Sequence, residues 1–135
     1  MLAQTLTIAG AAVMGLLGTV HLLYTCCTDR FDPNDAATKA AMQAGHPLLT
    51  RRTTLWRAWV GFNASHSLGA MLFATVYLIL AIGHIEWLRM SPALAWLAVV
   101  GSGGYVLLAL RYWFRTPLIG CAISTACFIG AACTR

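Results

Sequence analysis

Two histidines and an asparagine lie inside stretches of sequence that are otherwise almost entirely apolar. His21 stands near the end of the first stretch, and His66 lies nine residues after Arg57, in the first half of the second. Asn63 precedes His66 by three residues, which places both on one face of a helix. In antiparallel helices, His66 would lie about 13 Å along the axis from Arg57, at a depth similar to that of His21. Because unpaired polar groups are costly in hydrocarbon, we expect all three side chains to face the interior and approach one another.

Several kinds of chemistry could use this cluster. Two neutral imidazoles can bind a haem iron, and a quinone or a lipid headgroup could take hydrogen bonds from His66 and Asn63. His66 could also act as a general base that Asn63 orients. No metal ion is expected, because a third or fourth ligand is usually needed and no carboxylate lies inside an apolar stretch. The same residue types also join helices without any ligand, so the cofactor stays unknown, with haem and quinone as candidates.

The elements that must position these residues are membrane-spanning helices. Of the 135 residues 59% are apolar and only 10% are charged, whereas an average soluble domain is about 25% charged. This composition excludes a disordered chain, a nucleic-acid-binding domain and most soluble enzymes. Four apolar stretches approach the length of about 20 residues that a bilayer requires: residues 2–24, 58–82, 93–114 and 117–133. We therefore predict an all-α fold, an integral membrane four-helix bundle forming a single transmembrane domain over residues 1–135.

A short additional helix is expected in the polar segment between the first two stretches. Asp32, Pro33 and Asp35 predict its start, with a capping side chain, proline at the first helical position and an acid in the first turn. Residues 36–44 favour helix, and Gly45 and Pro47 end it. We expect this helix to lie at the inner membrane surface with weak attachment, since its apolar face is mostly alanine.

The distribution of positive charge predicts the orientation. Five Lys and Arg residues lie in the first connecting segment and two, Arg111 and Arg115, lie at the third, against two in the second connection and the tail. Because cytoplasmic loops carry the excess of positive charge, both termini should face outward. We expect a bacterial inner membrane protein with the bilayer as its partner and no nucleic acid partner. The first stretch lacks a basic leader, so we do not expect a cleaved signal peptide.

Small residues recur at helical spacing in three of the stretches. Such residues let membrane helices approach closely, so we predict helix packing at each set: Gly10 with Gly18, Gly61 with Ser65 and Gly69, and Gly120 with Ser124. The five cysteines contain no Cys-x-x-Cys pair, which argues against a thiol-redox enzyme.

One segment resembles a known kind of protein. The run Gly61-Phe62-Asn63-Ala64-Ser65-His66-Ser67-Leu68-Gly69, with Gly18-Thr19-Val20-His21 upstream, resembles a family of small bacterial four-span membrane proteins with a GFNxSHxxG segment. Size and span number are also loosely similar to those of DoxX-like membrane proteins. The resemblance implies the four-span topology and no particular activity.

For function, the sequence favours an accessory or binding subunit of a membrane assembly. We expect it to have a buried His/Asn polar site and other membrane subunits as partners. No segment outside the apolar stretches is long enough for a second domain, and no catalytic set is recognisable. The alternatives are a haem- or quinone-binding redox protein and a small membrane enzyme acting on a lipophilic substrate.

Overall fold

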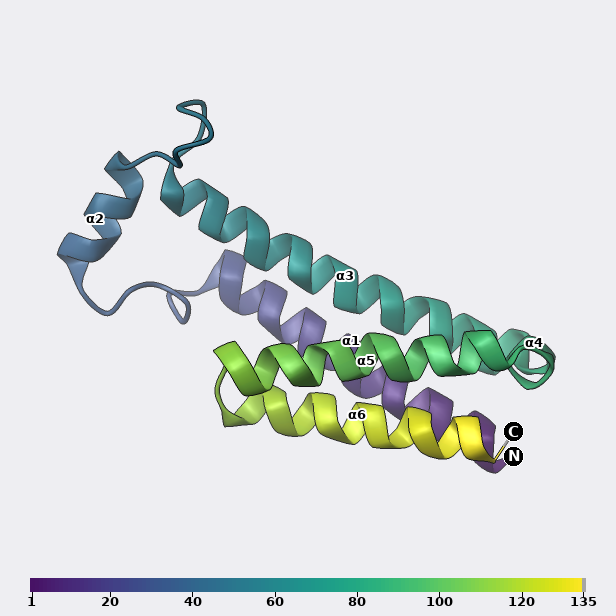
Figure 1. Ribbon diagram of the computed structural model, residues 1–135. Coiled ribbons are helices and arrows are strands. Elements are labelled where there is room, and N and C mark those ends of the chain that lie inside the picture. Colours follow the sequence, from purple (N-terminus) through teal and green to yellow (C-terminus); the bar gives the residue numbers. More distant parts are fainter. Residues whose placement is uncertain (135) are drawn as a thin grey trace. The chain divides into compact units, whose positions relative to one another are not determined.

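The computed structural model describes residues 1–134, and these form six helices and no strand (Figure 1). Four helices are long: α1 (Leu2–Cys27), α3 (Leu55–Gly83), α5 (Pro92–Tyr112) and α6 (Arg115–Cys133). Two are short: α2 (Ala36–Ala44) and α4 (Ile85–Met90). The all-α prediction with four long apolar helices is confirmed.

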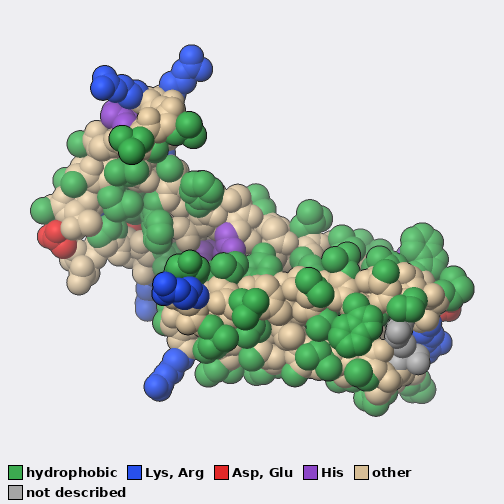
Figure 2. Space-filling model, in the orientation of Figure 1, with side chains coloured by type: hydrophobic (Ala, Val, Ile, Leu, Met, Phe, Trp, Pro, Cys, Tyr) green, Lys and Arg blue, Asp and Glu red, His purple; other side chains and the backbone are tan. Residues whose placement is uncertain are grey.

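The long helices have the length and composition of membrane spans. Their most apolar windows have mean hydropathies of 1.7 to 1.9, and they contain 19 to 29 residues each. Figure 2 shows apolar side chains spread over the long helices, whereas Lys and Arg side chains gather at loops and helix ends. Large apolar side chains on the outside of a helix suit contact with lipid rather than water. The four long helices therefore indicate an integral membrane protein.

Several helix ends differ from the sequence predictions, and one helix was not predicted. Helix α1 ends at Cys27, three residues later than predicted, and α3 begins at Leu55, three residues earlier. Asp35 caps α2, accepting hydrogen bonds from the backbone of Ala37 and Thr38, so the expected cap at Asp32 is wrong. Asp32 instead pairs with Lys39. Helix α6 begins two residues before Pro117. Helix α4, in the second connection, was not predicted, because six residues are too few for a periodic pattern to be visible.

The chain divides into two compact units. Unit 1 contains residues 1–17 and 70–134, and unit 2 contains Gly18–Gly69. Unit 1 packs the first part of α1, the second part of α3, α5 and α6 around two clusters of buried side chains. The larger residues of these clusters are Met14, Tyr77, Leu88 and Phe128.

Within unit 1, α1 and α6 cross at small residues. The Ser124 hydroxyl donates a 2.8 Å hydrogen bond to the carbonyl of Gly10. A Cβ at Gly10 would lie 3.1 Å from the Ser124 carbonyl oxygen and 3.1 Å from Cys127 Cβ, and a Cβ at Gly120 would lie 2.8 Å from a methyl group of Leu17. The absence of side chains at these glycines is thus what permits the approach.

Unit 2 contains the end of α1, α2 and the first half of α3. Lys39 joins α2 to its neighbours, because its ammonium pairs with Asp32 and lies 5.0 Å from the centre of the Trp56 ring. The face of α3 formed by Gly61, Ser65 and Gly69 is exposed, and a Cβ at Gly61 would meet no atom within 4 Å. The predicted packing at these three residues is therefore corrected: small residues permit a close neighbour but do not require one, and Ser65 bonds to Phe62 of its own helix.

Candidate functional site

His21, Asn63 and His66 all lie in unit 2 and come together there. His21 is on the last turns of α1, and Asn63 and His66 are on the first half of α3. His21 Nε2 is 3.0 Å from Asn63 Oδ1, and the imidazole rings of His21 and His66 are 5.2 Å apart at an angle of 66°. All three side chains are half-buried. The proximity that the sequence predicted is present, and its use as a ligand site stays a prediction.

The hydrogen bonds of Asn63 determine which nitrogen of His21 carries a proton. Asn63 Nδ2 donates to the carbonyl of Trp59 at 2.9 Å, so its Oδ1 is the atom that faces His21. An amide oxygen can only accept a hydrogen bond, and Nε2 of His21 must therefore donate. The neutral ring then has Nδ1 as an acceptor. The asparagine thus selects one tautomer of the first imidazole.

Two hydroxyl groups bind the backbone next to the cluster. Thr25 donates to the carbonyl of His21 at 2.8 Å, and the buried Ser67 donates to the carbonyl of Asn63 at 2.9 Å. Each hydroxyl donates to the carbonyl four residues earlier in its own helix. This is the usual way in which serine and threonine hydroxyls are hydrogen-bonded in membrane helices. The polar groups around the cluster therefore remain paired in an apolar setting.

An aromatic residue from the loop covers the cluster, and sequence reasoning missed it. The ring of Phe31 lies 4.6 Å from that of His21 and 6.0 Å from that of Tyr24. The indole N–H of Trp59 donates to the carbonyl of Phe31 at 3.3 Å. We call this ring, with its bond to Trp59, the Phe31 cover. Its one sequence signal is an aromatic residue inside the polar segment, which does not reveal that the loop turns back.

The distance and angle between the two imidazole rings exclude one of the candidate ligands, a haem held between them. A haem iron between two imidazoles holds their nitrogens about 4 Å apart and their ring centres about 6 Å apart, with the porphyrin between them. Here the rings are 5.2 Å apart, edge to face, and Nε2 of His21 is bonded to Asn63. This arrangement does not fit a haem held between them. Within residues 1–134, no three His, Cys, Asp or Glu side chains gather as a metal site would need.

The expected role of Asn63 toward a general base at His66 stays a prediction. A general base at His66 was expected to be oriented by Asn63, but the amide binds His21 and the carbonyl of Trp59. The amide of Asn63 therefore orients the ring of His21.

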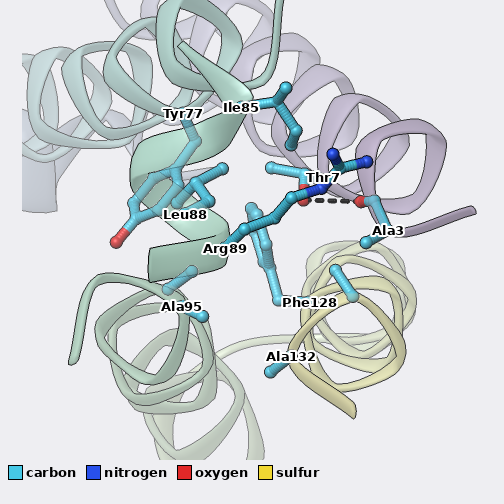
Figure 3. A pocket seen from close by; sticks show the side chains of 11 residues that line it. Ala3, Thr7, Tyr77, Ile85, Leu88, Arg89, Ala95, Phe128 and Ala132 are labelled. Carbon is cyan, nitrogen blue, oxygen red and sulfur yellow. Dashed lines mark hydrogen bonds between the residues drawn. The ribbon is translucent and has the colours of Figure 1, made fainter. Parts of the chain in front are cut away.

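A cavity in unit 1 is the other candidate for a site. Arg89 extends across it toward Thr7, among side chains that include Tyr77 and Phe128 (Figure 3). Its volume of about 20 Å³ is enough for one or two water molecules. The cavity is too small for an organic ligand.

No family model, curated protein or solved structure matches the chain. The resemblance of the Gly61–Gly69 segment to small bacterial four-span proteins stays a prediction. The His21–Asn63–His66 cluster in unit 2 is the strongest candidate for a functional site in the described chain.

Proposed function

We propose that this protein is a binding subunit of a membrane assembly, and that His21, Asn63 and His66 hold a polar group of its ligand or partner inside the membrane. The observation that carries the proposal is the hydrogen-bonded cluster itself, two imidazoles in edge contact with one of them oriented by an amide. Polar side chains in spans are costly, and they mark functional positions by default.

The proposed location is the bacterial inner membrane, with both termini outside. Its support is the charge count, since seven Lys and Arg residues lie in the first and third connections or on the helix ends that border them, and two lie elsewhere. The cluster then lies in the cytoplasmic half of the bilayer. The Phe31 cover, which comes from the first connection, approaches it from the cytoplasmic side.

A quinone is the second candidate, as the ligand of the same cluster. Neutral imidazoles both donate and accept hydrogen bonds, so they can bind the carbonyl of a quinone and the hydroxyl of its reduced form. The tautomer that Asn63 fixes leaves Nδ1 of His21 as an acceptor. An acceptor nitrogen next to a second imidazole suits a ligand that carries a hydroxyl group, as the reduced quinone does. A haem iron carries no such group.

The test is purification of the intact chain from membranes in a lipid-preserving polymer. Wild type is compared with His21→Ala, His66→Ala and Asn63→Ala, and with the matched control His84→Ala, an exposed imidazole outside the spans. Bound chains and extracted lipids are identified by mass spectrometry. We expect wild type and the control to retain a stoichiometric partner or a quinone, and the three cluster variants to lose it.

Two results would overturn the proposal. One is a chain that purifies alone, without a partner or quinone, and keeps its thermal stability in His66→Ala. The other is a Soret band in the visible spectrum, sensitive to dithionite and lost in both histidine variants, which would replace the binding subunit with a haem protein.

A further inference from the structure

The loop of residues 45–54, between α2 and α3 in unit 2, has a closed base. The backbone N–H of Leu55 donates to the carbonyl of Gly45 at 2.9 Å. A second contact joins the same two ends of the loop, because Nδ1 of His46 lies 2.7 Å from the carbonyl of Thr53. A carbonyl only accepts, so Nδ1 carries a proton. A turn closes the tip, where Thr50 N–H donates to Pro47. The loop is therefore a preformed projection rather than an unstructured linker.

Two leucines form the tip of this projection. Leu48 and Leu49 have relative exposures of 109% and 94%, the highest of the large apolar side chains between residues 2 and 134. The exposed apolar side chains of the long helices are explained by lipid around the spans. Leu48 and Leu49 lie outside the spans, so their exposure needs a separate explanation.

Positive charge follows the leucines directly. Arg51 and Arg52 are both exposed, and no acidic residue occurs between Ala36 and Leu55. The Lys39 charge on α2 is paired with Asp32, whereas neither arginine has an ion pair within the described residues. The loop thus combines a two-leucine tip with two available guanidinium groups. Guanidinium groups bind phosphate oxygens in a bidentate manner.

We propose that the loop of residues 45–54 is a membrane anchor that docks on an anionic lipid surface. Leu48 and Leu49 enter the boundary of the hydrocarbon, and Arg51 and Arg52 bind the lipid phosphates. Apolar side chains flanked by basic ones are the usual means by which a segment lies in a membrane interface. The charge complementarity selects lipid over a protein partner.

The chain's own spans bring a bilayer within reach of the loop. Six residue steps separate Leu49 from Leu55, where α3 begins, and an extended chain covers at most about 20 Å over that distance. The tip therefore cannot leave the neighbourhood of the membrane surface into which α3 is inserted. The anchor is independent of His21, Asn63 and His66, so its failure would leave the proposed function untouched.

Hydrogen exchange of the full-length protein in lipid nanodiscs tests the anchor. The amides of Leu48, Leu49 and Arg51 have no hydrogen-bond acceptor within residues 1–134, so only an outside cover can slow their exchange. Nanodiscs of phosphatidylcholine are compared with nanodiscs containing about one-third phosphatidylglycerol. Two arginines near an anionic surface should favour docking by about thirtyfold, and exchange at the tip should slow by up to that factor in the anionic discs.

Matched variants separate the contribution of the two arginines to docking from that of the two leucines. Arg51→Gln with Arg52→Gln should remove the difference between the discs, and Leu48→Ser with Leu49→Ser should remove the protection in both. Arg111→Gln with Arg115→Gln, two exposed arginines at the third connection, should keep the wild-type pattern. Equal exchange of the wild-type tip in the two discs would refute the anchor. Protection that survives both loop variants would also refute it and would indicate a protein cover.

Discussion

The crossing of α1 and α6 predicts that alanine is destabilising at Gly10 and harmless at Gly103. A Cβ at Gly10 would lie 3.1 Å from a backbone oxygen and 3.3 Å from the buried ring of Phe128. Neither neighbour can move freely, and overpacking of this kind costs about 1–3 kcal/mol. A Cβ at Gly103, in the middle of α5, would meet nothing within 4 Å.

The pair of variants isolates the contact, because both gain the same helix propensity of about 1 kcal/mol from the Gly-to-Ala change. The difference in unfolding free energy between Gly10→Ala and Gly103→Ala should therefore be about 1–3 kcal/mol. It is measured by equilibrium unfolding of the purified chain in mixed micelles, followed by circular dichroism. A Gly10→Ala protein as stable as Gly103→Ala would show that the two helices do not cross at this glycine.

Three further experiments test other parts of the chain. In Asn63→Ala the hydrogen-bond acceptor for His21 is lost, so the His21 ring should change from the Nε2–H form to a mixture of tautomers. Nitrogen NMR of labelled histidines measures this change, and an unchanged ring would contradict the hydrogen bond. The Asp35 pKa lies below its ordinary value of 3.8, chiefly because of hydrogen bonds from Thr38. The cap therefore stabilises α2 fully above that value and loses its effect as the pH falls through the lowered pKa. Intrinsically corrected amide exchange in α2 should accelerate in acid, and this dependence should be absent in Asp35→Ala. An impermeant maleimide should label the exposed Cys26 from the cytoplasmic side only and the exposed Cys133 from the outside only; the reverse pattern would overturn the orientation.

Hydropathy predicted the four long helices because a span must contain its own backbone hydrogen bonds, so its length and composition are properties of the sequence alone. Helix ends were harder. Asp32 and Asp35 both suit a cap, and the choice between them depends on Lys39, which takes Asp32 as an ion-pair partner. That competition is between residues seven apart and is not visible in a local pattern.

The candidate site was predictable in its members but not in its contacts. Helix periodicity correctly placed Asn63 and His66 near one face, and similar depth brought His21 to them. Periodicity does not show which imidazole meets the amide, because that depends on the rotation of α1 about its axis. Phe31 was missed because it is placed by the returning loop and by a hydrogen bond from Trp59, 28 residues away. The glycines of α1 and α3 have similar spacing, yet Gly10 is buried and Gly61 is exposed.

The Phe31 cover has a consequence for affinity. It is held by one hydrogen bond of 3.3 Å and by ring contacts with His21 and Tyr24. The hydrogen bond and the His21 contact together contribute about 1–3 kcal/mol. An energy of that size leaves the cover open in about 1% to 15% of molecules at equilibrium. A ligand that must reach the face of the His21 ring binds only that fraction, so its apparent dissociation constant is about seven- to a hundredfold higher than the intrinsic one. Shortening Phe31 to alanine would remove this population factor and tighten binding without any new contact to the ligand.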